Sequence, residues 1–188
     1  MCWVFFIDLS KAFDTLDHRI LLQKLEHHGI RGQAQNLLES YLMGRSQYTS
    51  IGNEYSDACA VTFGVPQGSV LGPLLFLLYI NDIINSSTNG HFVLFADDTN
   101  IFVVADTVED VYKLANKALD EVHKYMISNQ LHINFSKCTY MHFRPRLNNH
   151  ERMTSARTIP FIEHTRNVIK VNGHKLKKVD KVRFLGVI

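Results

Sequence analysis

Cysteine and long apolar runs are scarce in this 188-residue chain, and their scarcity excludes several classes of protein. The three cysteines are Cys2, Cys59 and Cys138. They are odd in number and far apart, which excludes a disulfide framework or a zinc spacing and favours a reducing compartment. The longest apolar-leaning run, residues 70–80, is shorter than the roughly 20 residues of a membrane span. Residues 2–7 meet Asp8 with no basic region before them, so we expect no signal peptide. We therefore expect an intracellular protein, nuclear or cytoplasmic, without a membrane partner.

The composition is that of an ordinary globular domain, with 46% hydrophobic and 20% charged residues. The formal net charge of +2 hides a division of charge along the chain. Residues 1–136 hold 8 Lys and Arg against 15 Asp and Glu, a net charge of −7, whereas residues 137–188 hold 12 against 3, a net charge of +9. Such asymmetry indicates a polyanionic partner for the basic part. Solvated charged faces, or pairing between the two parts, are simpler alternatives.

Hydrophobic spacing predicts a mixture of strands and helices. Residues 3–7 are continuously apolar and predict a strand buried on both faces. Further strands are expected at residues 48–51, 58–63, 131–133 and 139–143, and Asn172-Gly173 predicts a hairpin turn within residues 168–188. Helices are expected at residues 32–43, 70–84 and 108–127, after a first helix that Asp14 or Asp17 caps and Gly29 ends. On the second helix, the expected buried residues are Leu37, Leu38, Tyr41 and Leu42. We predict an α+β fold: a mainly antiparallel sheet with helices packed on one face, plus a C-terminal β-hairpin.

Two adjacent carboxylates, Asp97 and Asp98, stand between the apolar runs 91–95 and 99–104, which predict a hairpin with the acids at its tip. Unpaired acids in so apolar a setting repel each other and lose hydration. A hard divalent cation explains their placement, because Mg²⁺ binds carboxylate oxygens. An ordinary Asp-Asp turn is an equal alternative, since acids are common in turns.

A third carboxylate, Asp8, ends the predicted strand at residues 3–7 and favours the metal interpretation. Two-metal phosphoryl transfer needs acids from separate elements that hold two cations about 3.5–4 Å apart. One ion lowers the pKa of the attacking hydroxyl, and the other neutralises charge on the leaving pyrophosphate. A helix N-cap is the alternative for Asp8, although Asp14 and Asp17 are better placed for it. We therefore predict that the strands carrying these acids are neighbours.

Five segments in order along the chain resemble the sequence motifs of the reverse transcriptase palm. They are residues 6–14 (FIDLSKAFD), 64–82 (GVPQGSVLGP, then LLFLLYIND), 95–98 (FADD), 131–138 (LHINFSKC) and 182–188 (VRFLGVI). The alanine before the acid pair, and Tyr41-Leu42 with Arg45 and Gln47, are typical of non-LTR (LINE-type) retrotransposons. The resemblance covers essentially the whole chain, and five ordered motifs are far more specific than any one of them.

The resemblance implies a polymerase palm fold and an RNA-directed DNA polymerase. Such an enzyme transfers a deoxynucleotidyl group from a dNTP to a primer 3′-hydroxyl, with an RNA template and a DNA primer as partners. The resemblance further implies that Asp8, Asp97 and Asp98 hold two Mg²⁺ ions, with Mn²⁺ as a substitute, and that the Leu9 carbonyl helps.

Contacts with the incoming nucleotide are also implied by the resemblance. The residues concerned are Leu9, Ser10, Lys11, Ala12, Phe13, Gln67 and Gly68. Phe13 corresponds to a steric gate, an aromatic ring beneath the sugar that leaves no room for a 2′-hydroxyl. Gln67 and Gly68 correspond to contacts with the nucleotide and the template base, where glycine permits close backbone approach. Core packing for Phe13, and a plain helix-entry loop at residues 64–68, are the alternatives.

Two further roles follow from the last two motifs. Lys137 corresponds to a general acid near the triphosphate, and a solvated lysine at a strand end is an equal alternative. The primer grip corresponds to Phe184, Leu185 and Gly186, for which a plain edge strand is the alternative.

The motifs also suggest a domain organisation. We expect a palm at residues 1–143, a polar loop at residues 144–160, and a C-terminal β segment with the primer-grip motif at residues 161–188. The fingers and thumb of a complete polymerase are not recognised, so we expect a fragment of a larger polyprotein. A catalytically inactive remnant that only binds nucleic acid or protein is the alternative function. An RNA-dependent RNA polymerase is a third, against which Phe13 argues.

Overall fold

The computed structural model describes residues 1–143 and 168–182, which divide into two compact units. The sheet unit holds Met1–Asp8, Ser87–His123 and the described residues from Asn134 onward. The helical unit holds Leu9–Ser86 and Lys124–Ile133. The predicted polar loop and the primer-grip motif lie outside the described residues. Within the described ranges, no helix is long and apolar enough to cross a membrane.

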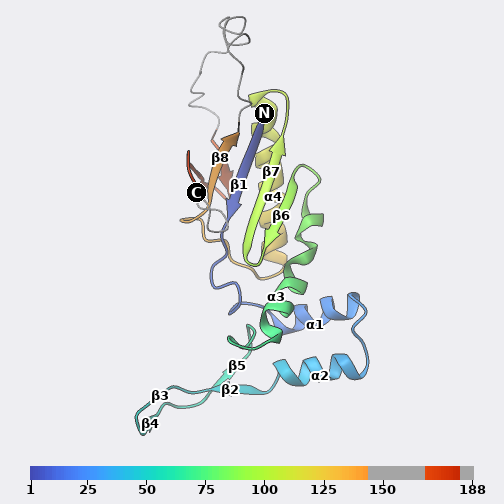
Figure 1. Ribbon diagram of the computed structural model, residues 1–188, viewed down its shortest axis with the longest axis vertical. Helices are drawn as coiled ribbons and strands as arrows, with labels where there is room; N and C mark the ends of the chain where they lie inside the picture. Colours follow the sequence, from blue (N-terminus) through green and yellow to red (C-terminus); the bar gives the residue numbers. More distant parts are fainter. Residues whose placement is uncertain (144–167, 183–188) are drawn as a thin grey trace, which may run out of the picture. The chain divides into compact units, whose positions relative to one another are not determined.

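The sheet unit is built on a five-stranded sheet. Its strands are β1 (Cys2–Ile7), β6 (His91–Phe95), β7 (Asp98–Val104), β8 (Thr139–Phe143) and β11 (Lys177–Lys178). They lie in the order β11-β8-β1-β7-β6, of which Figure 1 labels β8, β1, β7 and β6. All neighbours are antiparallel except β11 and β8, which are parallel. The predicted α+β fold with a mainly antiparallel sheet is therefore confirmed.

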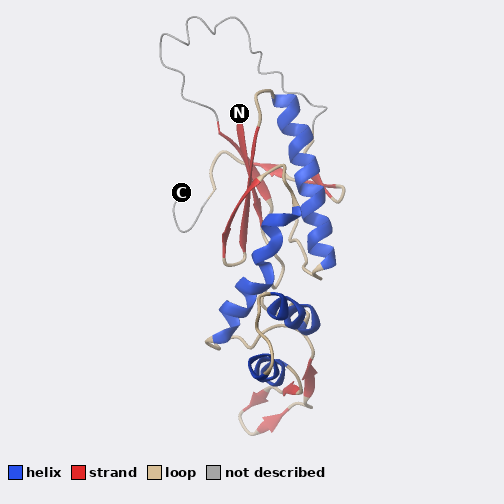
Figure 2. Cartoon of the chain, turned by 90° about the vertical axis from the view of Figure 1, so that its right-hand side faces the viewer, coloured by secondary structure: helices blue, strands red, loops and turns tan. Residues whose placement is uncertain are grey.

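One helix, α4 (Val108–Ser128), lies along a face of this sheet (Figures 1 and 2). The central strand β1 buries Trp3 and Phe5, and the Trp3 ring makes an edge contact with Tyr112 of α4 at 4.5 Å between ring centroids. Within the sheet unit the helix buries an apolar stripe, which consists of Val111, Ala115, Ala118, Leu119 and Val122. Each fully buried Val, Leu or Met contributes about 1.5–3 kcal/mol to folding, so this stripe fixes the helix on its side of the sheet.

A small hairpin, β9 (Lys170–Val171) with β10 (His174–Lys175), completes the sheet unit. Its turn is Asn172-Gly173, both with positive φ (48° and 79°), as a two-residue hairpin turn requires. The predicted turn is therefore confirmed. The ring of His174 stacks on Phe135 at 4.3 Å, which fixes the hairpin to the segment before β8.

The helical unit consists of α1 (His18–His27), α2 (Gln33–Leu42), α3 (Leu71–Ile80) and the 3₁₀ helix η1 (Asn81–Ser86), together with the last residues of α4. Asp17 caps α1, because its carboxylate accepts hydrogen bonds from the N–H groups of Arg19 (2.8 Å) and Ile20 (3.1 Å). Burial opposes ionisation of Asp17, but these hydrogen bonds outweigh it and lower the pKa of its carboxyl. Of the two predicted caps, Asp17 is the one that acts.

The segment between α2 and α3 forms two short antiparallel ribbons. The strand β2 (Arg45–Gln47) pairs with β5 (Cys59–Val61), and β3 (Ser50–Ile51) pairs with β4 (Glu54–Tyr55) (Figure 1).

Two expectations from the sequence about the helical unit were wrong. Of the four residues of α2 expected to be buried, only Leu42 is: Leu38 and Tyr41 are half-buried, and Leu37 is 69% exposed. The predicted strand at residues 131–133 is reduced to one bridge between Ile133 and Leu9.

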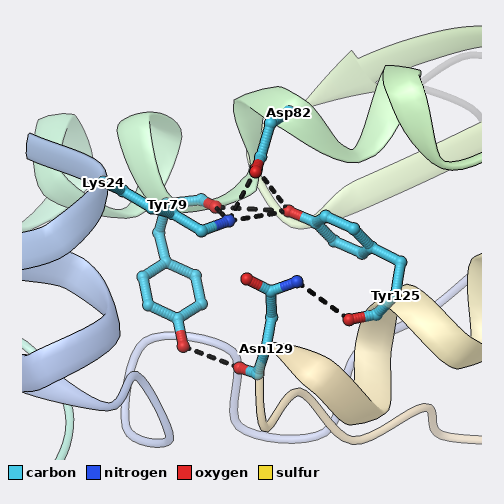
Figure 3. Close-up of polar contacts among 5 residues, drawn as sticks. All are labelled: Lys24, Tyr79, Asp82, Tyr125 and Asn129. Atoms are coloured by element: carbon cyan, nitrogen blue, oxygen red, sulfur yellow. Dashed lines mark hydrogen bonds and ion pairs between the residues drawn. The ribbon is translucent and has the colours of Figure 1, made fainter. Parts of the chain in front are cut away.

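A partly buried polar network ties the elements of the helical unit together (Figure 3). The ammonium of Lys24 on α1 donates to the Tyr79 carbonyl (2.6 Å), to the Asp82 carboxylate (2.6 Å) and to the Tyr125 hydroxyl (3.0 Å). The Tyr125 hydroxyl donates to the same oxygen of Asp82 at 2.6 Å, and the Tyr79 hydroxyl donates to the Asn129 carbonyl at 2.6 Å. The polar network thus joins α1, α3, η1 and the end of α4.

Candidate functional site

Asp8 and Asp98 lie side by side at one end of the central strand pair. The strands β1 and β7 are antiparallel, and Ile7 pairs with Thr99. Asp8 follows Ile7 and Asp98 precedes Thr99, so the two acids lie at the same end of the pair. Asp97 lies in the turn between β6 and β7. The structure therefore brings the three predicted acids to one end of the sheet, as expected from the sequence. It differs in one detail: Asp98 begins β7 by pairing with Phe95 and is not itself a turn residue.

The turn that carries Asp97 is strained. Its first central residue, Ala96, has a φ of 51°, in the left-handed region that residues other than glycine, asparagine and aspartate seldom adopt. Such strain costs on the order of 1 kcal/mol and is common next to functional groups. The strain lies in the residue that precedes the acid pair.

A pocket of about 160 Å³ opens beside Asp8 and Asp98. Its lining residues are Phe6, Ile7, Asp8, Asp98, Asn100, Lys137, Thr139 and Val182. All of them belong to the sheet unit. The pocket thus brings together three of the four residues predicted to be catalytic.

The carboxylates of this pocket are poorly compensated within the described residues. One oxygen of Asp8, Oδ2, is buried without a hydrogen-bond partner there, and the Lys137 ammonium lies 3.8 Å from it. Partial burial, and then the charges of Asp97 and Asp8, raise the pKa of the Asp98 carboxyl. A bound cation would relieve both conditions, because it supplies the positive charge that the acids lack.

The donor set fits a divalent cation. Hard cations such as Mg²⁺ bind carboxylate oxygens and keep several waters, so they do not need a cage made wholly of protein ligands. In the described ranges, no three His, Cys, Asp or Glu side chains converge closely enough to ligate one ion by themselves. Waters or substrate phosphates would have to complete the coordination.

The backbone of Asp8 is held by residues of the fourth motif. Its carbonyl accepts from the Asn134 N–H at 2.9 Å, and its N–H donates to the sulfur of Cys138 at 3.4 Å. Burial raises the pKa of the Cys138 thiol to about 11, so the thiol stays protonated at neutral pH. Cys138 therefore helps to place Asp8 and is not poised as a nucleophile.

The predicted nucleotide contacts lie in the helical unit. Leu9 and Ala12 are buried, whereas Lys11 is exposed with a φ of 50°. Ser10 donates its N–H to the His132 carbonyl at 2.8 Å. The half-buried ring of Phe13 lies 4.6 Å from the ring of Phe76, which is fully buried in α3. Core packing for Phe13 is therefore present, and the ring keeps an exposed portion besides.

The loop before α3 lies against the segment that carries Phe13. The amide nitrogen of Gln67 donates to Asp14 at 2.6 Å. Gly68 has a φ of 78°, and a Cβ at this position would meet no other atom within 4 Å. The space beside Gly68 is therefore open, as a backbone contact with a ligand would require.

Several residues of this site are only weakly marked in the sequence. Asn100 and Thr139 line the pocket, yet each lies in a strand whose pattern is mainly apolar. Asn100 is 2% exposed, and a buried amide inside an apolar strand is the signal that could have revealed it. Asp14 was considered only as a helix cap, but it is the hydrogen-bond partner of Gln67. Phe184, Leu185 and Gly186 lie outside the described residues.

The sequence profile of a protein family described as "Reverse transcriptase (RNA-dependent DNA polymerase)" matches residues 1–188. The RNA-directed DNA polymerase from mobile element jockey of Drosophila funebris is 25% identical over 97% of this chain and 19% of its own length. The Pol polyprotein of the type-1 retrotransposable element R1 of Bradysia coprophila is 27% identical over 96% of this chain and 16% of its own length. A probable RNA-directed DNA polymerase from transposon X-element of Drosophila melanogaster is 40% identical over 44% of this chain and 9% of its own length. The chain thus spans a fifth or less of these relatives.

A solved structure shares the fold. Apo telomerase from Candida tropicalis, truncated from its C-terminal domain, aligns with a TM-score of 0.57 and 12% identity over 79% of this chain and 32% of that one. At this level of identity the likeness concerns the fold alone.

Proposed function

The chain belongs to the reverse transcriptase (RNA-dependent DNA polymerase) family, and from this premise we propose that it carries the catalytic centre of a non-LTR retrotransposon polymerase. In the proposed reaction, a primer 3′-hydroxyl attacks the α-phosphate of a dNTP opposite an RNA template, and pyrophosphate leaves. The observation that carries the proposal is the pair Asp8 and Asp98, which line one pocket at the end of neighbouring strands.

Reverse transcriptases generally use divalent metals, and the acids of the pocket suit them. We assign Asp8, Asp97 and Asp98 as the residues that would hold two Mg²⁺ ions, or Mn²⁺ in their place. When bound, the ions would supply a lower pKa for the primer hydroxyl and charge neutralisation for the leaving pyrophosphate. The unpaired oxygen of Asp8 and the raised pKa of Asp98 support this assignment.

Lys137 is proposed to act on the leaving group. Its ammonium is mostly exposed, lines the pocket and lies 3.8 Å from Asp8. A flexible cation at the mouth of the pocket is able to contact an anionic pyrophosphate and to hand it a proton.

Selection of the nucleotide is assigned to the helical unit. The contact of Phe13 with Phe76 would hold the ring rigidly enough to exclude a 2′-hydroxyl. Gln67, held by Asp14, and the open backbone at Gly68 are proposed to lie against the incoming nucleotide and template base. The other contacts proposed from the family motif are Leu9, Ser10, Lys11 and Ala12.

The basic C-terminal part is proposed to contact the template–primer backbone. Lys170, Lys175, Lys177 and Lys178 are all exposed, and Lys170 stands directly opposite Lys175 across the β9–β10 hairpin. Like charges at opposed positions repel, and neighbouring phosphates would offset that repulsion. We also propose a division of the chain into three parts: the palm at residues 1–143, a loop at residues 144–160 and the primer-grip segment at residues 161–188.

Primer extension tests the assignment. The chain, expressed with the coding sequence that flanks it, is given an RNA template, a DNA primer, dNTPs and Mg²⁺. We expect Asp8→Asn and Asp98→Asn to lower kcat on the order of 10³-fold, because the ligand charge is lost. Asp106→Asn is the matched control, since Asp106 is exposed just beyond the opposite end of β7.

Three outcomes would count against the proposal. Normal extension by Asp8→Asn would remove the metal assignment. A wild-type protein that binds template–primer without extending it would be the inactive remnant. A preference for rNTP over dNTP would indicate an RNA polymerase instead.

A further inference from the structure

We propose that His18 is a positioning residue that fixes the loop at residues 64–69 against the segment at residues 13–17. Through this contact it would set the place of Gln67 relative to Phe13. That the ligand of this loop is a dNTP rests on the proposed function, whereas the role of His18 in fixing the loop does not.

His18 begins α1 and is 3% exposed. Its Nε2 lies 2.6 Å from the carbonyl oxygen of Gly64. A carbonyl can only accept, so Nε2 carries the proton and donates it. The second ring nitrogen, Nδ1, is buried and has no hydrogen-bond partner among the described residues. A buried nitrogen without a partner costs about 1–3 kcal/mol, and an apolar side chain would avoid that cost. What the imidazole offers that a leucine cannot is the hydrogen bond to Gly64.

The backbone of Gly64 is fixed on both of its polar groups. Its carbonyl accepts from His18, and its N–H donates to the Leu16 carbonyl at 2.8 Å. The next N–H, that of Val65, donates to the Phe13 carbonyl at 2.9 Å. The close approach also requires glycine: φ is 81°, and a Cβ on Gly64 would lie 2.8 Å from the Asp14 backbone. The start of the loop therefore lies directly on the chain that carries the proposed steric gate.

The far part of the loop uses the same segment as its support. Gln67, three residues after Gly64, donates to the Asp14 side chain at 2.6 Å. Gly64 at the start of the loop and the Gln67 amide farther along it are thus both hydrogen-bonded to residues 13–18, and all of these residues belong to the helical unit. Loss of the His18 donor would leave the buried Gly64 carbonyl unpaired and free the loop to shift. A shift of the loop would displace Gln67 from its proposed contact with the nucleotide and weaken nucleotide binding.

Hydrogen–deuterium exchange on the purified chain tests the mechanical role without any need for activity. In His18→Leu, we expect amides of residues 62–70 to exchange about tenfold faster than in the wild type. His18→Gln should restore slow exchange, because the glutamine Nε2 lies at nearly the same reach as the histidine Nε2. His18→Asn is one methylene too short and should behave like His18→Leu. His27→Leu, the same change at the exposed far end of α1, should leave the loop unchanged.

The kinetic arm uses primer extension with the same variants. We expect His18→Leu to raise KM for dNTP about tenfold with kcat changed less than threefold, and His18→Gln to recover most of the loss. Unchanged exchange in both His18→Leu and His18→Asn would overturn the proposal. So would equal defects in His18→Gln and His18→Leu, or faster exchange spread evenly over α1, α2 and α3, which would indicate a general structural role. If the wild type lacks polymerase activity, the proposed function fails while the exchange experiment still decides the role of His18.

Discussion

The carboxylate of the polar network in the helical unit is paired within the chain, whereas the carboxylates of the sheet unit are only partly paired. In the polar network, the Lys24 ammonium has three acceptors (Figure 3). Burial opposes ionisation of Asp82, but hydrogen bonds from Lys24 and Tyr125 prevail and lower the pKa of its carboxyl. In the sheet unit, partial burial and neighbouring acids raise the pKa of Asp98, and Asp8 keeps a buried oxygen without a hydrogen bond.

This difference separates charges that are paired within the chain from charges whose pairing is incomplete. In the polar network each charge has a partner within the chain, so removing one partner leaves the other unpaired and destabilises the fold. A cluster of like charges with a single exposed cation beside it costs stability, and such clusters concentrate at functional sites. The sheet unit therefore carries its acids at a cost that a bound cation would remove.

The largest effect expected from breaking this contrast is the loss of Lys24. Lys24→Met keeps an unbranched apolar side chain but removes the donor to the Tyr79 carbonyl and the partner of Asp82. We expect the free energy of unfolding to fall by about 3 kcal/mol, measured by urea denaturation.

The control for Lys24→Met is Lys113→Met. Lys113 pairs with Glu109 at 2.9 Å, but both side chains are about 70% exposed (69% and 71%), so we expect no measurable change. If the two variants behaved alike, the polar network would not be the stabilising element that its hydrogen bonds indicate.

The elements that follow from local chemistry were predictable from the sequence. The continuous apolar run of β1, the Asn172-Gly173 turn and the apolar stripe of α4 each depend on neighbours a few residues away. The burial of α2 was not predictable in the same way. Leu37 has the spacing of a buried residue, but burial depends on which part of the helix surface its neighbours cover, and in α2 only Leu42 is buried.

The acids of the candidate site were predictable, and the contacts that support them were not. Asp8 and Asp98 each end or begin an apolar run, which marks them in the sequence. The contacts of His18 with Gly64 and of Gln67 with Asp14 join residues 46 and 53 positions apart. No local pattern encodes such contacts, because they depend on how the loop before α3 folds back on the segment before α1.

Addition of Mg²⁺ sharpens the contrast with a smaller effect. A cation that binds the folded acids should raise the free energy of unfolding by about 1.4 kcal/mol at ten times its dissociation constant. We expect this rise, measured by thermal unfolding, in the wild type and in Lys24→Met. In Asp8→Asn it should be absent, and an equal rise there would place the ion elsewhere.

The smallest effect expected is the response of Asp98 to pH. Its folded pKa is raised, so ionisation costs stability above that pKa, and the cost disappears below the unfolded value near 3.8. Asp98→Asn should therefore have a free energy of unfolding about 0.3 kcal/mol higher than the wild type at pH 7, after allowance for solvent screening, and should melt at a slightly higher temperature. The difference should vanish as the pH falls below about 3.8.

Asp82→Asn should change the free energy of unfolding in the opposite direction. The pKa of Asp82 is lowered, so its contribution is present at pH 7 and is lost as the pH falls through that lowered value. Changes of the same sign in both variants would mean that the two acids do not differ in the way their partners indicate. A gain in stability at Asp98 together with a loss of polymerase activity would show directly that this carboxylate is kept for a ligand rather than for the fold.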